Sequence, residues 1–262
     1  MKNESINSNE IAIVVLSFDG FHELWKPFFD YFFQTWNDCP YKIYLLNNFQ
    51  KYDDERITNL LVGEDVSWSD SLKKGLEKIA EKRVFFLYDD AFIYQLDKSE
   101  ITNCFQTAII NDYTSVMLRP SLFINQFSRK KIQLIPDNAL YRNALFCNLI
   151  QREHLIKLLQ SSESAWDFEL AGNKRSVSFR YYSTNRKIIF YHHGIVKGKW
   201  FYSIYKQLKQ EGYSFEKLNK SLTRVQSIQL NWKTRIYETF LRLTPIKIVR
   251  KIENKRKKQI YN

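Results

Sequence analysis

The sequence is poor in the residues that interrupt or cross-link a chain. Its 262 residues include only 7 glycines, 5 prolines and 3 cysteines. The cysteines, Cys39, Cys104 and Cys147, lie far apart, and their odd number and lack of a Cys-x-x-Cys spacing argue against a disulfide framework or a zinc site. We expect them to act as small apolar side chains in a reducing cytosol.

Long apolar runs are also absent. No stretch of about 18 consecutive apolar residues occurs, so no helix is expected to span a membrane. The first ten residues, MKNESINSNE, are polar and contain no apolar segment of the kind found in secretory signals. These absences leave a soluble protein or one bound at a membrane surface.

Aromatic side chains and basic charge are abundant. Aromatic residues make up 16% and hydrophobic residues 44% of the chain, as in a packed globular protein. Of the formal net charge of +12, a net +8 falls between Lys233 and Lys258, where there are ten basic and two acidic residues. Enzymes that act on nucleic acids more often carry their charge along the catalytic face, so no nucleic-acid partner is expected.

The first 90 residues alternate between apolar runs and amphipathic segments. The runs at 11–17, 41–48 and 83–88 predict strands that are buried on both faces. Between them, apolar residues at helical spacing predict one helix over 21–36 and another that begins at the N-cap Ser67. This alternation favours right-handed crossovers and a parallel sheet.

The second half is less regular. We expect an α/β fold with a mostly parallel sheet flanked by helices, and we assign residues 1–10 to a disordered N-terminus, 11–212 to one α/β domain and 213–262 to a basic helical extension. The elements predicted in the second half are strands over 115–120, 131–136 and 143–150, helices over 151–159 and 164–172, a strand over 187–191, a turn over 192–200 and a helix over 201–211.

The basic extension has two interpretations. Apolar residues interspersed with Lys and Arg over 230–258 fit helices that lie in the headgroup plane of an anionic membrane, and Pro245 predicts two short helices rather than one. The alternative is a packed C-terminal helix with a solvated charged face. The first interpretation places the protein in the cytoplasm, peripherally at the inner face of the cell membrane.

Polar residues follow each of the three strands predicted in the first half. In an open parallel sheet, ligands bind beyond the carboxyl ends of the strands. Two adjacent carboxylates repel each other unless a cation compensates them, and Mg²⁺ or Mn²⁺ prefers such oxygen ligands. The alternative for the carboxylate pair is a solvated turn. The polar residues at these strand ends are Ser17, Asp19, Asn47, Asn48, Asp89 and Asp90.

The sequence YDDAF at 88–92 resembles the metal-binding motif of GT-A glycosyltransferases, in which an Asp-x-Asp sequence ends a strand and holds a diphosphate through a divalent metal. The resemblance covers residues 11–212, the expected catalytic domain, and implies a GT-A-like, Rossmann-like fold. Four segments, in this order, are similar to bacterial glycosyltransferases that build lipopolysaccharide O-antigen and capsule: GEDVSWSDSL (63–72), LYDDAF (87–92), ESAWDFE (163–169) and GIVKGKW (194–200).

The resemblance implies a nucleotide-sugar donor, in the first place a UDP-sugar, and a saccharide or lipid-linked acceptor. It implies that Asp90, with Asp89, holds Mn²⁺ or Mg²⁺, and His193 is a further candidate for the metal shell. The donor contacts that it implies are Ser17, Asp19, Asn47, Asp65, Trp68, Asp89 and Lys197.

The ESAWDFE segment supplies the candidates for a general base. An inverting transfer needs a base near the acceptor hydroxyl, and the resemblance implies a carboxylate there, Asp167 or Glu169. Because Ser164 and Asp167 also form a helix-start signal, Asp167 has a structural alternative, and we favour Glu169. Lys197 would stabilise the leaving diphosphate. Trp68 either stacks on the donor or belongs to the core.

Two other functions remain compatible with the sequence. A hydrolase of nucleotide-sugars or other phosphoesters would use the same carboxylates with water as the acceptor. A non-enzymatic adaptor that binds a membrane or a nucleic acid would use Asp89 and Asp90 only as a turn.

Overall fold

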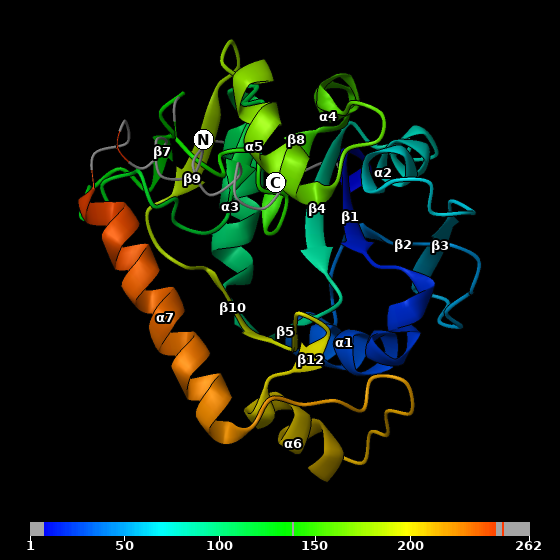
Figure 1. The fold of residues 1–262 in the computed structure, drawn as a ribbon. Coiled ribbons are helices and arrows are strands. Elements are labelled where there is room, and N and C mark those ends of the chain that lie inside the picture. The colour runs from blue at the N-terminus through cyan, green and yellow to red at the C-terminus, as the bar shows by residue number, and fades with distance from the viewer. Residues whose placement is uncertain (1–7, 138, 245–247, 249–262) are drawn as a thin grey trace.

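The structure, a computed structural model, describes residues 8–137, 139–244 and 248 (Figure 1). Its centre is an eight-stranded sheet in the order β3-β2-β1-β4-β8-β6-β9-β7. The pairings β3–β2, β2–β1, β1–β4 and β6–β9 are parallel, and β4–β8, β8–β6 and β9–β7 are antiparallel. The strands are β1 (Ile11–Leu16), β2 (Lys42–Asn47), β3 (Ile57–Leu61), β4 (Arg83–Tyr88), β6 (Ser115–Met117), β7 (Ile132–Leu134), β8 (Asn148–Gln151) and β9 (Tyr181–Thr184).

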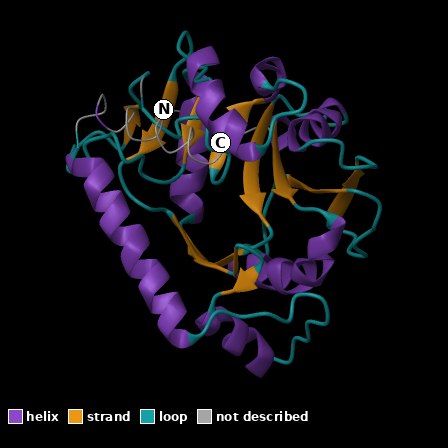
Figure 2. Ribbon diagram, viewed as in Figure 1, coloured by secondary structure: helices purple, strands orange, loops and turns teal. Residues whose placement is uncertain are grey.

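Helices cover both faces of this sheet (Figure 2). α1 (His22–Thr35) and α3 (Lys98–Ile110) pack on one face, and α2 (Trp68–Glu77), α4 (Arg152–Leu158) and α5 (Ala165–Arg175) pack on the other. The expected α/β fold, with a mostly parallel sheet flanked by helices, is therefore confirmed.

The strands β1 and β4 lie in the middle of the sheet because both of their faces are apolar. Successive residues of a strand point to opposite faces, so Ile13 packs in the core under α1 and Val14 in the core under α2. The parallel pairing aligns Leu16 with Tyr88. The residues that follow the two strands consequently leave the sheet side by side.

A smaller layer crosses beyond the carboxyl end of β4 (Figure 1). β5 (Ala91–Leu96) begins directly after the carboxylate pair and runs antiparallel to β10 (Ile189–His193). β11 (Ile195–Val196) and β12 (Lys199–Trp200) then form a hairpin. This layer brings a late part of the chain to the end of β4.

The first-half predictions and the second-half helices are confirmed in outline. The predicted strands over 11–17, 41–48 and 83–88 are β1, β2 and β4, and α1 and α2 lie between them as expected. The helices predicted over 151–159, 164–172 and 201–211 are α4, α5 and α6 (Tyr202–Gln210).

The second-half strands differ more from the expectation. The predicted strands 115–120 and 131–136 shorten to β6 and β7, and the one over 143–150 begins only at Asn148. Asn148 donates its backbone N–H to Leu145 and Cys147 has a φ of 54°, so a turn occupies the residues before β8. The strand predicted over 187–191 is displaced to β10, and the turn predicted over 192–200 contains the β11–β12 hairpin. β3, β5, α3 and β9 were not expected.

Only the first of the two C-terminal helices predicted around Pro245 lies within the described residues, and it is longer than expected. One helix of 20 residues, α7 (Arg224–Leu243), begins at a capping box formed by Thr223 and Gln226. It ends just before Pro245, and a second helix after that proline lies outside the described residues except for Ile248.

The chain termini are described only in part. Of the N-terminus expected to be disordered, residues 1–7 lie outside the described residues and Ser8–Glu10 form a short 3₁₀ helix. Within the described ranges, no helix is both long and apolar enough to cross a membrane.

Candidate functional site

The ends of β1 and β4 are joined by a partly buried hydrogen-bond chain. The Ser17 hydroxyl accepts a hydrogen bond from Trp25 Nε1 at 2.6 Å and donates to the Asp89 carboxylate. Asp89 is only 3% exposed, and burial raises the pKa of its carboxyl well above the ordinary value, although the Ser17 bond opposes this. The structure thus places Asp89 inside the protein, where it ties the two strand ends together.

Asp90 lies one residue further on, at the start of the crossing layer. Its carbonyl accepts the Gly194 N–H at 2.6 Å, and the pairing of β5 with β10 sets His193 opposite Ala91. A Cβ on Gly194 would lie 2.5 Å from the Phe92 ring, so this close approach requires glycine. The structure therefore brings Asp90 and His193 to the same edge.

The carboxylates at this edge offer few protein ligands to a divalent cation. Among the described residues no group of three or more His, Cys, Asp or Glu side chains could hold a metal ion. Burial raises the pKa of Asp90 to about 6, as expected for a carboxylate in a low-dielectric site that has no ion pair among the described residues. A cation bound through one such carboxylate and completed by substrate phosphates fits this arrangement.

A cavity of about 130 Å³ opens beside the ends of β1 and β2. Asn47 is fully buried there; its side-chain nitrogen donates to Asp19 and to the Gln50 carbonyl, whereas its Oδ1 has no hydrogen-bond partner. A buried acceptor of this kind is normally satisfied, so a ligand N–H or O–H would find a partner in it. The cavity is lined by Leu16, Ser17, Phe18, Leu46, Asn47, Asn48, Val62, Asp65, Trp68, Ser71 and Leu72.

Four of the residues expected to contact the donor thus meet at one cavity: Ser17, Asn47, Asp65 and Trp68. Asp65 accepts a hydrogen bond from the Ser71 hydroxyl at 2.9 Å, so its position is fixed by α2. The Trp68 ring lies 5.5 Å from the Phe168 ring. Trp68 is therefore both a wall of the cavity and a contact to α5.

Asp19 does not line this cavity. Its carboxylate accepts the backbone N–H groups of Asn48, Phe49 and Gln50, and its own N–H donates to Asn48 Oδ1 at 3.1 Å. Asn48 in turn donates to the Gly63 carbonyl. The structure uses Asp19 to hold the loop after β2, which forms the rim of the cavity.

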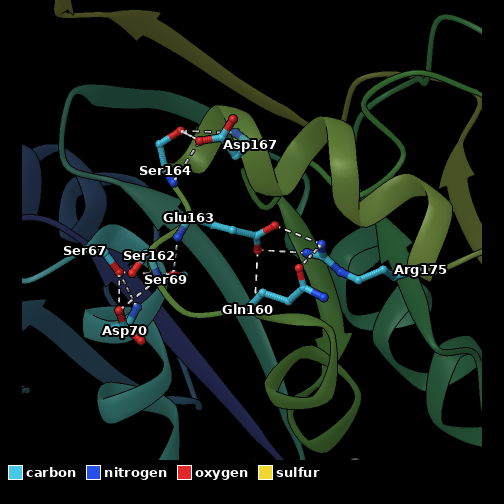
Figure 3. Close-up of polar contacts among 9 residues, drawn as sticks. All are labelled: Ser67, Ser69, Asp70, Gln160, Ser162, Glu163, Ser164, Asp167 and Arg175. Carbon is cyan, nitrogen blue, oxygen red and sulfur yellow. Dashed lines mark hydrogen bonds and ion pairs between the residues drawn. The ribbon is translucent and has the colours of Figure 1, made fainter.

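A second network, which we call the α2–α5 clasp, fixes α5 against the start of α2 (Figure 3). Ser69 and Glu163 exchange two hydrogen bonds, Glu163 N to Ser69 Oγ and Ser69 N to Glu163 O. Asp70 accepts from the hydroxyls of Ser67 and Ser161 and from the Ser162 N–H. The Glu163 carboxylate also accepts two hydrogen bonds from Arg175, at 2.9 and 2.8 Å.

The two candidate bases lie in different environments on α5. Asp167 closes a capping box with Ser164, whose hydroxyl donates to it at 2.6 Å, so Asp167 stabilises the start of the helix. Glu169 is partly buried, and burial raises its pKa while the positive charge of Arg119 opposes the rise. Burial raises the pKa of Tyr88, and the negative charges of Glu169 and Asp90 raise it further. Tyr88 thus lies within electrostatic reach of both carboxylates.

Arg119 was missed by the sequence analysis. It follows β6, which runs in the same direction as β4 because the antiparallel β8 lies between them. Its positive charge lowers the pKa of His193, after partial burial as the larger cause, and opposes the rise at Glu169. A charged residue at the end of the strand predicted over 115–120 was the available signal.

Lys197 lies at the tip of the β11–β12 hairpin. Lys197 and Gly198 have φ values of 51° and 71°, the backbone of a tight two-residue hairpin turn, and the Lys197 side chain is exposed. Gly194, at the base of the hairpin, bonds to Asp90. The lysine therefore projects from a segment that is attached to the carboxylate edge.

Comparison with known proteins gave matches in structure alone: no protein-family model and no curated protein sequence matches this chain. Residues 1–349 of S. aureus TarS in complex with UDP-GlcNAc align with 79% of this chain and 68% of that chain, at 8% identity and a TM-score of 0.48. The chain spans 60% of another structure of TarS 1–349 and 36% of a longer TarS structure.

Two further solved structures are similar in fold. A cytidylyltransferase from Leptospira borgpetersenii aligns over 90% of this chain and 98% of its own, at 10% identity and a TM-score of 0.47. The galactosyltransferase LgtC, in complex with donor and acceptor sugar analogues, aligns over 64% of this chain and 70% of its own, at 10% identity and a TM-score of 0.38.

Proposed function

We propose that this protein is a glycosyltransferase that moves a sugar from a nucleotide-diphosphate donor, in the first place a UDP-sugar, to an acceptor hydroxyl. One observation carries the proposal. The cavity lined by Asn47, whose buried Oδ1 has no hydrogen-bond partner, lies beside the end of β1, and Asp90 at the neighbouring end of β4 shares the surroundings of Tyr88 with the half-buried Glu169. Donor binding and proton removal would thus have separate groups on the two sides of one strand end.

The donor half of the proposal concerns the cavity. Asn47 Oδ1 would accept an N–H or O–H of the base or ribose, and Trp68 would form the wall beside it. Mn²⁺ or Mg²⁺, held by Asp90 with His193 nearby, would supply positive charge to the diphosphate. Asp89 would support Asp90 from inside the protein, because its carboxylate is already bonded to Ser17.

The acceptor half concerns Glu169 and Arg119. Burial raises the pKa of Glu169, which makes the ionised carboxylate a stronger base toward an acceptor hydroxyl. Direct displacement by that hydroxyl would invert the anomeric centre. Arg119, together with Lys197 on the hairpin, would stabilise negative charge on the departing diphosphate. Asp167 takes no part, since its carboxylate closes the α5 capping box.

The acceptor and setting follow from the motif resemblance. We propose a saccharide or lipid-linked acceptor in the synthesis of a bacterial surface polysaccharide, O-antigen or capsule, at the inner face of the cell membrane. An enzyme acting there on a lipid-linked acceptor would work at the membrane surface.

A nucleotide panel tests the proposal. Thermal unfolding is measured with UDP-, GDP-, CMP- and dTDP-sugars, each with and without Mn²⁺. We expect one nucleotide class to raise the Tm, with a larger rise in Mn²⁺. At donor concentrations of about 100 times Kd the stabilisation is about 3 kcal/mol.

The matched variants are Asp90→Ala and Asp53→Ala. Asp53 is an exposed carboxylate after β2 and serves as the control. Asp90→Ala should abolish the Mn²⁺-dependent part of the shift, and Asp53→Ala should retain it. Equal shifts in the two variants would contradict the role of Asp90. Product analysis then distinguishes a glycosyltransferase from a hydrolase. Free sugar released at the same rate without an acceptor identifies a hydrolase.

A further inference from the structure

The helix α7 exposes a continuous apolar face. Its members recur every three or four residues, so they form one stripe along the helix, which we call the α7 stripe. A helix of 20 residues is about 30 Å long, and the stripe runs over nearly all of it. The stripe consists of Val225, Ile228, Trp232, Ile236, Phe240 and Leu243, whose exposed fractions lie between 41% and 80%.

The opposite face of α7 is fixed to the body of the protein. Near its start, Ser227 is buried and accepts a hydrogen bond from the Tyr202 N–H at 3.2 Å. Near its end, Leu241 is buried against Leu140, and Tyr237 and Leu170 pack on the same cluster. The stripe therefore faces outward because the inner face of the helix is already occupied.

The surroundings of the stripe are basic. Arg224, Lys233, Arg235 and Arg242 of α7 are exposed, and Glu238 is its only acidic residue. Basic residues continue in the sequence after the helix: Lys247, Arg250, Lys251, Lys255, Arg256, Lys257 and Lys258. An apolar stripe with this charge is complementary to a surface that is apolar inside and negative outside.

A groove between α6 and α7 adjoins the same face. Its volume is about 590 Å³, and Lys206 of α6 and Arg224 of α7 both line it. Ile228 belongs to the stripe and also lines the groove. Cationic groups are thus placed where the headgroups would lie if the stripe were inserted among acyl chains.

We propose that α7 docks on an anionic phospholipid bilayer, with the α7 stripe at the boundary between headgroups and acyl chains and Lys206 and Arg224 on phosphate groups. Each basic residue near such a surface contributes about 1 kcal/mol, and the apolar residues add area that leaves water. A second copy of this chain is a poorer occupant, because stripe-to-stripe pairing would bring two basic helices together.

The helix α7 also packs against α5, the helix that carries the candidate base. Tyr237 and Leu241 pack in the cluster that contains Leu170, the neighbour of Glu169 on α5. The membrane face and the helix of the candidate base are therefore parts of one packed unit. Bilayer binding needs neither donor nor acceptor, so it can be tested independently of the proposed transfer reaction.

Vesicle flotation of the full chain tests the proposal. Vesicles of phosphatidylcholine alone are compared with vesicles of equal parts phosphatidylcholine and phosphatidylglycerol. The decisive variant is Ile236→Lys, which adds positive charge while it removes an apolar side chain from the stripe. Its control is Ile110→Lys, at an 81% exposed position at the end of α3.

We expect wild type and Ile110→Lys to float with the anionic vesicles and Ile236→Lys to bind about tenfold more weakly, as loss of one buried apolar side chain implies. Equal or tighter binding of Ile236→Lys would show attraction by charge alone and overturn the insertion of the stripe. Equal binding to both vesicle types would overturn the role of anionic lipid. A wild-type dimer in sedimentation that Ile236→Lys converts to a monomer would assign the stripe to a second copy and overturn the proposal.

Fluorescence gives a second readout that does not depend on folding of the lysine variant. Vesicles with brominated acyl chains should quench the wild type, and Trp232→Phe should bind equally well but lose part of that quenching. Unchanged quenching in Trp232→Phe would mean that the stripe stays outside the acyl region, contrary to the proposal.

Discussion

The two sides of the candidate site are held in place by different physical means. On the cavity side, Ser17 and Asp19 have their hydrogen bonds satisfied within the protein, and Asn47 alone leaves one buried atom unpaired. On the α5 side, Glu169 and Arg119 act on each other by charge across a partly buried space. In the proposed reaction the cavity side would thus be preorganised for donor binding, and the α5 side would be adjusted electrostatically for proton transfer.

The largest expected effect is a loss of kcat without a change in donor affinity, which would distinguish the α5 side from the cavity side. Glu169→Gln removes the proposed base and should lower kcat by about 10²- to 10⁴-fold, as for other general bases. Donor affinity should stay the same, because the cavity is untouched. Asp167→Asn is the control: it should lose about 1 kcal/mol of stability from the cap but keep most of its activity. A larger loss of kcat in Asp167→Asn would reverse the assignment of the base.

The second half of the chain should account for a loss of folding stability at low pH. His154 on α4 is buried and hydrogen-bonded to the Tyr181 hydroxyl at 2.8 Å, and burial lowers its pKa to about 4. The native state therefore favours the neutral ring. Its contribution to the free energy of unfolding is fully present above the unfolded pKa of about 6.5 and is lost as the pH falls toward 4.

The loss at pH 4 amounts to as much as about 3 kcal/mol. Urea unfolding at pH 7, 5.5 and 4 should therefore show a smaller decline in His154→Gln than in the wild type. If the stability of the wild type and of His154→Gln declined equally with falling pH, His154 would be excluded as the cause of the acid sensitivity.

Removal of the Ser17 hydroxyl tests the preorganised side. Ser17→Ala leaves the Trp25 N–H and the buried Asp89 carboxyl without their shared partner, which should cost about 1–3 kcal/mol. Chemical denaturation measures this against Ser178→Ala, an exposed serine outside the site. A stability loss no larger than that of Ser178→Ala would mean that the Trp25–Ser17–Asp89 chain is dispensable.

The smallest expected effect concerns the α2–α5 clasp. Glu163→Gln weakens the pair with Arg175 but keeps the backbone bonds to Ser69, so α5 should remain folded and shift slightly. We expect kcat to fall about fivefold, equivalent to about 1 kcal/mol, with donor affinity unchanged. Glu153→Gln, which breaks a surface pair with Arg152, is the matched control. Changed donor affinity in Glu163→Gln would show that the clasp supports the cavity instead.

The first half of the fold was predictable because its strands are continuous apolar runs. β1, β2 and β4 are buried on both faces, so their sequences carry a strong signal. β5 was missed since only part of it is buried and only the two turn residues Asp89 and Asp90 separate it from β4. The residues before β8 are apolar but form a turn, which tertiary packing decides and a local pattern does not reveal.

The candidate site was predictable to the extent that strand ends define it. The rule for parallel strands predicts that Ser17, Asn47 and Asp90 lie at one edge of the sheet, and the β2–β1–β4 order places the three strand ends next to one another. Arg119 ends a predicted strand, but its position at the site could not be predicted, because the direction of β6 in the sheet depends on the antiparallel β8 between β4 and β6. The hydrogen bonds that commit Asp19 to a loop are equally invisible, because they join residues about 30 positions apart.

Gly194, at the base of the β11–β12 hairpin, also affects how fast the hairpin can move. Gly194 donates to the Asp90 carbonyl at 2.6 Å, and its own carbonyl accepts the Phe201 N–H at 2.8 Å, a bond that closes the base of the hairpin. The hairpin cannot move away from Asp90 without breaking the first of these bonds. Exchange of the Gly194 amide with deuterated solvent should therefore be as slow as that of the sheet amides, while rotation of the Lys197 side chain, on the nanosecond scale, remains free.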